Sequence, residues 1–409
     1  MIAATTILVV GVLLVALLSQ FHGYRLGGVL VLPLVAVYTF REPFSPLVFA
    51  VAAGGAWATL WAVREYTLLH GRQVFLVGVV AGAVVSVLAT LLLWAAFPDR
   101  ISYEDAEVVG SIFPGIAAYN VMWQDPADRR EDLTLSVGVF LLLLAVGTIA
   151  VYLVAARGLP TPPVLLLPTS DAVALLGVEP VGTPTPRIVP AWLSVSLLLA
   201  DVAVYEGFRR RYDLRLAGIV LIPLLAMFSL RYGPTVLVYG VGAATVFWML
   251  SLVHWTTLLY GRNLLAVALA GGLLVVLPVG VLEPAAAPGI TLLFIGVFVG
   301  IGAYNLHRVA PSNRSAHIRI SAGLFVVFYA VLLAVVPVPR TGLSSTFAPA
   351  YVALGAVIVG LAAVEIARLE RSRPDAHAFA SESVFAEGLP ADADTESSPL
   401  VARREGDDS

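Results

Sequence analysis

Long apolar stretches alternate with short polar turns along most of this chain. Stretches such as residues 46–63 and 73–97 approach or exceed the roughly 20 residues that a helix needs to cross a bilayer core. The pattern therefore predicts an all-α integral membrane protein. The opening residues, beginning at Met1, carry no basic region ahead of the first apolar stretch, so we expect a first spanning helix there and not a cleaved signal peptide.

The same pattern occurs twice. Residues 25–72 and 215–262 align without a gap at an offset of 190, with 18 identities in 48 positions. Farther along, the segments at 115–120 and 300–305 align at an offset of 185. Shared apolar composition alone could not place Arg, Pro and Asn in register. We therefore interpret the chain as a membrane unit of roughly 150 residues that has been duplicated.

Each copy divides into six apolar elements, and a thirteenth segment belongs to neither copy. The elements are 3–20, 26–40, 46–69, 73–97, 108–123 and 134–155 in the first copy, 191–207, 216–230, 235–259, 263–282, 291–306 and 320–338 in the second, and 347–367 at the end. We expect the two copies to share one fold and to pack face to face, with the fifth elements near their shared interface.

These elements define five regions along the chain. They are a first membrane repeat (1–156), a linker (157–190), a second membrane repeat (191–340), an additional transmembrane helix (341–373) and an acidic tail (374–409). The linker is assigned because eight prolines lie between 160 and 190. The tail combines nine acidic residues with two arginines and no helical period, so we expect it to be disordered.

The second and fifth elements are short and contain Gly and Pro. Pro33 and Pro223 lie in the second elements, and Pro114 and Gly115 lie in the fifth element of the first copy. Short broken elements at matching places of two repeats are typical of discontinuous or re-entrant helices around a central site, although proline-kinked spans would give the same pattern. Six full spans per copy would make the repeats parallel, and one re-entrant element per copy would make them inverted.

Composition narrows the chemistry. The chain is 59% apolar and 12% charged, it has no cysteine, and all 24 of its basic residues are arginine. Disulfides, thiolate chemistry, a phosphate-loop lysine and a Schiff base are thereby excluded. No catalytic motif or metal-ligand spacing is present, so we expect no cofactor, no metal, no nucleic-acid partner and no enzymatic activity. Any nucleotide-driven step would belong to a partner protein.

Arginine placement predicts an orientation in the plasma membrane. If all thirteen elements span, twelve arginines fall on one side and six on the other. Because cytoplasmic loops carry the excess of basic residues, we expect the first side to be cytoplasmic. The N-terminus would then lie outside and the C-terminus inside.

A Leu-x-Gly-Arg turn between two long elements occurs in both copies, at Gly71-Arg72 and Gly261-Arg262. Glycine permits a positive φ in such a tight connection, and arginine places a cation at the membrane interface. The arginine could simply reach lipid headgroups and set topology. Alternatively, the pair could attract an anionic polymer or a partner protein.

Three polar residues lie within apolar elements. Asn120 and Asn305 end the fifth elements, where an amide can bond a neighbouring helix or line a polar path. Asp201 lies about ten residues into the apolar run that starts at 191. An intramembrane acid is costly, so it indicates either a structural arginine partner or a role in transport.

The first copy resembles the small membrane subunit of poly-γ-glutamate capsule synthases, the CapC/PgsC family. The resemblance is carried by the order of Gly23, Gly27, Gly28 and Pro33, by the helix end and turn at 68–75, by 113–120, and by the helix containing Thr134, Ser136 and Gly138. A weaker match covers 207–338. The family subunit is a single unit, so a tandem copy departs from its pattern, as does Val299 in the place of Pro114.

The resemblance implies a non-catalytic component of polymer biosynthesis. It would anchor an ATP-dependent amide ligase beside the lipid bilayer, assist export of the polyanion, and act with other capsule-synthesis proteins. A repeat-built secondary transporter for a small organic anion is the main alternative. A membrane domain that only scaffolds a partner is a third hypothesis.

Overall fold

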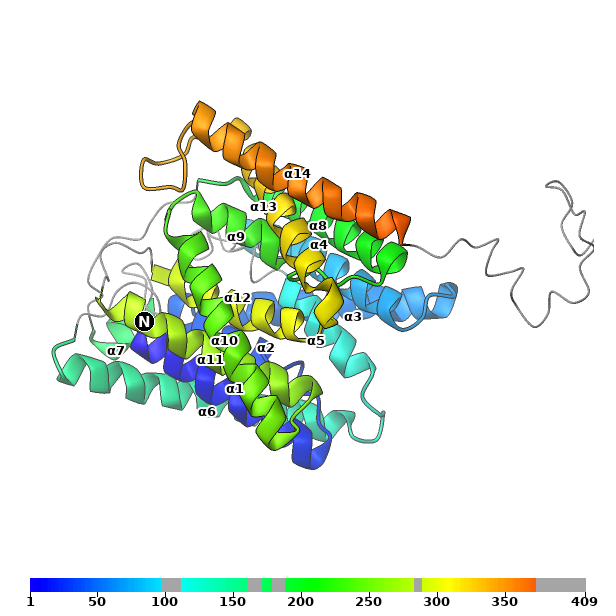
Figure 1. Ribbon diagram of the computed structural model, residues 1–409. Helices are drawn as coiled ribbons and strands as arrows, with labels where there is room; N and C mark the ends of the chain where they lie inside the picture. Colours follow the sequence, from blue (N-terminus) through cyan, green and yellow to red (C-terminus); the bar gives the residue numbers. More distant parts are fainter. Residues whose placement is uncertain (97–111, 160–170, 179–187, 283–288, 373–409) are drawn as a thin grey trace, which may run out of the picture.

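The computed structural model describes residues 1–96, 112–159, 171–178, 188–282 and 289–372. The first repeat contains α1 (Ile2–His22), α2 (Val31–Arg41), α3 (Ser45–Tyr66), α4 (Arg72–Ala96), α5 (Phe113–Met122) and α6 (Arg129–Ala156). The second contains α8 (Ala191–Tyr212), α9 (Leu221–Ser229), α10 (Thr235–Thr257), α11 (Gly261–Leu282), α12 (Gly289–His307), the 3-10 helix η3 (Pro311–Asn313) and α13 (Arg314–Val335). The short α7 (Asp171–Leu176) lies between the repeats, and α14 (Pro349–Arg371) follows them (Figure 1).

The described part of the chain is helical throughout its regular structure, which confirms the all-α prediction. Nine of the described helices are long and apolar enough to cross a membrane. Large apolar side chains such as Trp57, Trp248 and Leu354 are exposed on α3, α10 and α14. Faces of this size fit lipid and not water. The chain is therefore a multi-pass membrane protein.

Each repeat consists of two three-helix groups. In the first repeat α1, α2 and α6 pack together, as do α3, α4 and α5. In the second repeat α10, α11 and α12 form the group equivalent to α3, α4 and α5, while α9 packs against both α8 and α13. The shared element order and shared helix pairs agree with a duplicated fold.

The repeats contact each other reciprocally through their first and fourth helices. α1 packs along α11, and α4 lies beside α8 (Figure 1). Each of these pairs joins the first helix of one copy to the fourth helix of the other, but α1 and α11 pack closely whereas α4 and α8 touch only slightly. The fifth helix of the second copy also reaches the first copy, since the rings of Phe294 and Tyr38 lie 6.4 Å apart.

The helix ends make the repeats parallel. α1 and α12 end beside the start of α11, through contacts of Gln20 with Asn263 and of Tyr304 with Gly261. In the other copy α8 and α5 end beside the start of α4, through Arg72–Glu206 and Tyr119–Phe75 contacts. The two sets of helix ends lie together, because Asn120 near the end of α5 bonds Gly27 just beyond the end of α1. The first and fifth helices therefore end, and the fourth begins, at one common face in both copies. We call this the arginine face, and an inverted arrangement is inconsistent with it.

The second element is a discontinuous span. α1 ends at the arginine face and α3 returns to that face after 22 helical residues, so the chain between them must cross. It does so with an irregular segment, residues 23–30, followed by the 11-residue α2. Leu26, Gly27 and Gly28 in this segment have positive φ values of 48°, 67° and 118°. The re-entrant alternative is therefore wrong for this element, and the broken-helix alternative holds.

The prolines of the short second and fifth elements begin helices and do not interrupt them. Pro33 and Pro223 lie in the first turns of α2 and α9, and Pro114 lies in the first turn of α5. Proline is tolerated there because first-turn N–H groups have no intrahelical acceptor. The expectation that these prolines interrupt a helix is therefore wrong. The fifth elements also differ: α5 has 10 residues, whereas α12 runs for 19 without a break.

The linker region contains α7, whose Leu176 is buried in the main core, so part of this region packs on the membrane unit. The tail at 374–409 lies outside the described residues.

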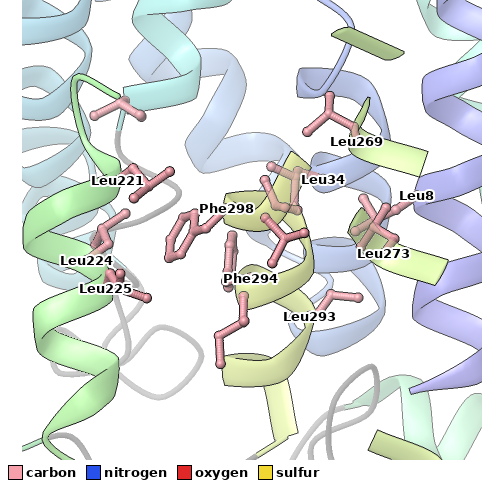
Figure 2. Packing of buried hydrophobic residues seen from close by; sticks show 14 of the residues in the cluster. Leu8, Leu34, Leu221, Leu224, Leu225, Leu269, Leu273, Leu293, Phe294 and Phe298 are labelled. Carbon is pink, nitrogen blue, oxygen red and sulfur yellow. The ribbon is translucent and has the colours of Figure 1, made fainter. Parts of the chain in front are cut away.

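The centre of the protein is filled by apolar side chains from both repeats. Figure 2 shows Leu8 and Leu34 of the first repeat beside Leu273 and Phe294 of the second. The ring of Phe294 also stacks on Phe228, with centroids 6.0 Å apart, and lies tilted against Phe298 at 6.2 Å. This shared core joins the two repeats into one packed unit.

Close helix contacts depend on small residues. A Cβ added to Gly82 of α4 would lie 2.6 Å from the backbone nitrogen of Gly115 in α5. A Cβ added to Gly272 of α11 would lie at the same distance from the backbone nitrogen of Gly300 in α12. Small residues let membrane helices approach at backbone distance, which favours their association through van der Waals packing.

Candidate functional site

The Leu-x-Gly-Arg turns adopt the predicted conformation. Gly71 and Gly261 have φ values of 56° and 63°, and a Cβ added at either would meet no atom within 4 Å. The glycines are therefore required for backbone conformation and not for space. Each turn places its arginine at the start of the fourth helix, on the arginine face.

Arg72 is part of the interface between the repeats. Its Nε donates to Glu206 of α8 over 2.9 Å, and its guanidinium lies 5.3 Å from the centre of the Tyr205 ring. Glu206 also accepts from Nε of Arg210, again at 2.9 Å. The side chain of Arg72 is thus held by the second repeat and does not project freely toward a ligand.

Arg262 occupies the equivalent position but has different surroundings. Ala16 stands where Glu206 stands in the other copy, and α1 contains no acidic residue. Arg262 is exposed and forms no hydrogen bond or ion pair with any described residue. The charged groups near enough to act on it are Arg25 and Asp132, and Tyr119 also lies close.

Asn120 and Asn305 perform the same task in the two copies. Nδ2 of Asn120 donates to the carbonyl oxygen of Gly27 over 3.1 Å. Nδ2 of Asn305 donates to the carbonyl oxygen of Ala217 over 2.6 Å. Both acceptors lie in the irregular segment before the second helix, where backbone groups lack helical partners. The asparagines therefore join helices and satisfy backbone, as in the first of the two alternatives.

The irregular segments have further polar supports that the sequence analysis missed. Oδ1 of Asp132, which is buried at the start of α6, accepts the backbone N–H groups of Arg25 and Leu26 at 2.8 and 3.0 Å. At the equivalent position His317 contacts the carbonyl oxygen of Arg215 through Nδ1 at 2.6 Å. Asp132 and His317 are equivalent positions at the offset of 185. Their equivalence was not noticed in the sequence because the residue types differ.

Asp201 is fully buried on α8, and neither carboxyl oxygen has a partner among the described residues. The structural arginine partner that the sequence left open is therefore absent from the described part of the chain. At the offset of 190 the first copy has Gly11, which packs closely against Pro33 of α2. A buried and unpaired carboxyl group is costly, so Asp201 stays a candidate functional residue.

A network of ion pairs attaches α14 at the arginine face. Glu365 is buried and accepts from Arg319 of α13 at 2.6 Å and from Arg368 at 3.3 Å. Arg211 of α8 donates to Glu370 at 2.5 Å, and the Tyr212 hydroxyl donates to the same carboxylate at 2.8 Å. The described residues contain no group of three His, Asp or Glu side chains that could hold a metal, and we assign no metal site.

Comparison with known proteins identifies the family. The family described as capsule biosynthesis CapC matches this chain twice, at residues 10–130 and 201–315, which together exceed half of its length. Each match begins in the first helix of a repeat and ends near the start of its sixth helix. Searches of curated proteins and of solved structures found no match. This chain therefore belongs to the CapC family of capsule biosynthesis proteins and carries the family unit twice.

Proposed function

We propose that this protein is a non-catalytic membrane subunit in the synthesis of a poly-γ-glutamate type of capsule. Its role would be to hold an ATP-dependent amide ligase at the arginine face and to assist the export of the polyanionic product. The observation that carries the proposal is the double family match on a membrane fold whose polar end concentrates arginine. Anionic polymers and their precursors are attracted by such a surface.

The sequence supports a division of labour with a partner. It contains no lysine and no cysteine, so the usual phosphate-loop chemistry for ATP has no place in this chain. The membrane unit supplies instead a rigid support with a common face for both repeats. A ligase bound there would release its product directly at the membrane.

Deletion of the gene tests this proposal. Polymer outside the cell would be collected, hydrolysed with acid and analysed for glutamate, and the ligase would be followed by immunoblotting of membrane and soluble fractions. We expect the glutamate polymer to disappear and the ligase to move from the membrane to the soluble fraction. Complementation with the intact gene should restore both. Unchanged polymer and an unchanged ligase distribution in the deletion strain would contradict the proposal.

A second candidate function is favoured by one observation. The buried and unpaired carboxyl group of Asp201 is the type of group that intramembrane transport pathways use. On this alternative the protein would itself carry a small organic anion. Purified protein in liposomes should then take up labelled glutamate, and Asp201→Asn should abolish the uptake without reducing the yield of folded protein. Absence of uptake by the wild-type protein would remove this candidate.

A further inference from the structure

The two arginine turns are equivalent in sequence but differ in what surrounds them. Glu206 neutralises Arg72, and Tyr205 covers its guanidinium. The residues of α1 at the positions of Tyr205 and Glu206 are Val15 and Ala16, which can neither cover nor neutralise Arg262. Duplication has thus produced one closed arginine site and one open arginine site.

The open site brings together groups from both repeats. Asn263, next to Arg262, donates to Gln20 in the last turn of α1 over 2.9 Å. Arg25 lies just beyond the end of α1, in the segment fixed by Asp132 and Asn120. Arg25 and Arg262, one from each repeat, therefore lie close enough for the charge of one to act on the other.

The nearby acidic groups are engaged elsewhere. Oδ1 of Asp132 accepts two backbone N–H groups. Glu131 accepts a hydrogen bond from the Tyr24 hydroxyl at 2.7 Å. Neither carboxylate forms an ion pair with Arg25 or Arg262 among the described residues.

A third hydrogen-bond donor at the open site, the hydroxyl of Tyr119, is also unused. Tyr304, at the end of α12, donates its hydroxyl to the Gly261 carbonyl oxygen over 3.2 Å and accepts from Arg308 at 3.0 Å. Its counterpart Tyr119 contacts the rings of Phe75 and Trp123 but makes no hydrogen bond to a described residue. Two guanidinium groups, one from each repeat, and the phenol of Tyr119 are therefore available at the open site.

We propose that Arg25 and Arg262 together form a binding site for one oxyanion group, a carboxylate or a phosphate, at the junction of the repeats. Guanidinium groups bind such anions through paired, charge-assisted hydrogen bonds, and a shared anion would relieve the repulsion between two neighbouring cations. The site occurs once per chain because Glu206 fills the equivalent place. Only the assignment of the anion to a polymer carboxylate rests on the proposed function.

Binding to purified protein in zwitterionic detergent tests the site. A short γ-linked glutamate oligomer would be titrated by calorimetry against the wild type, Arg25→Gln, Arg262→Gln, the double variant, and the matched controls Arg72→Gln and Arg340→Gln. We expect each of the first two variants to weaken binding by about tenfold or more. The double variant should bind little worse than either single variant, because both arginines hold one anion. Both controls should bind like the wild type.

A second experiment, on lipid binding, distinguishes a polymer carboxylate from a lipid phosphate as the bound anion. Native mass spectrometry would count phosphatidylglycerol molecules retained from mixed vesicles by the wild type and by Arg262→Gln. Loss of one bound lipid with unchanged oligomer binding would assign the site to a lipid phosphate. Wild-type behaviour of Arg25→Gln and Arg262→Gln in both arms would overturn the proposal, as would equal weakening by Arg340→Gln. A negative result here would leave the ligase distribution in the deletion strain, and hence the proposed function, unaffected.

Discussion

Arg72 of α4 and Glu206 of α8 form an ion pair of 2.9 Å that joins the two repeats at the arginine face. The equivalent Arg262 faces α1, which has no acidic residue, and it forms no ion pair with a described residue. Sequence equivalence therefore does not extend to the surroundings of these two arginines. We therefore expect Arg72 to stabilise the packing of the repeats and Arg262 to be the arginine that binds a ligand.

The Arg72–Glu206 pair should contribute measurably to stability. We expect Arg72→Gln and Glu206→Gln each to lower the midpoint of thermal unfolding in detergent. A double-mutant cycle should give a coupling of about 1 kcal/mol, because the pair is only partly exposed and has good geometry. Arg262→Gln, which removes no hydrogen bond among described residues, is the matched control and should leave the midpoint unchanged. A coupling near zero would show that the pair does not join the repeats.

The turn glycines provide a test of backbone conformation alone. Gly71→Ala should destabilise the protein by about 1 kcal/mol, since an L-residue is disfavoured at a φ of 56°. The control is Gly54→Ala in the interior of α3, where a Cβ also meets nothing within 4 Å but φ is not positive. We expect Gly54→Ala to be neutral or stabilising. Equal effects of the two substitutions on thermal unfolding would refute the explanation.

Asn120 and Asn305 should be structural. Replacement of either by Ala leaves the carbonyl oxygen of Gly27 or Ala217 without its donor, and we expect a loss of about 1 kcal/mol in each case. Asn313→Ala is the matched control, because Asn313 precedes α13 without a side-chain capping bond. Unfolding by detergent titration would measure the three variants. Stability of Asn120→Ala equal to that of Asn313→Ala would argue that the amide serves another purpose.

The repeat, the thirteen elements and the glycine turns could be predicted because they depend on local pattern. The length of each apolar stretch predicts a helix, and a Gly-Arg pair between two long helices indicates a tight turn. The prolines were harder to interpret, since the pattern does not show whether Pro33 begins a helix or breaks one. The roles of Asp132 and Glu206 could not be predicted at all. Each contacts a residue more than 100 positions away, so only the packing of the helices reveals its partner.

The reciprocal packing of the repeats can be tested by crosslinking, for which the cysteine-free chain is a suitable background. Gln20→Cys with Asn263→Cys places thiols on α1 and α11, and a short bifunctional thiol reagent would join them. After cleavage at a protease site introduced into the linker, the two halves should stay together on a denaturing gel. Gln20→Cys with Gln73→Cys, which probes the fourth helix of the same repeat, should let the halves separate. Separation with the first pair, despite modification of both thiols, would contradict the packing.

The unequal roles of the two arginines form the central claim, and extracellular polymer per molecule of membrane-inserted protein tests it most directly. The measurement compares cells that express the wild type, Arg72→Gln, Arg262→Gln or the opposite-face control Arg340→Gln in place of the native gene. We predict that Arg262→Gln reaches wild-type protein levels but yields several-fold less polymer, whereas Arg72→Gln lowers the protein level and leaves polymer per molecule unchanged. Full polymer production per inserted molecule of Arg262→Gln would contradict the claim.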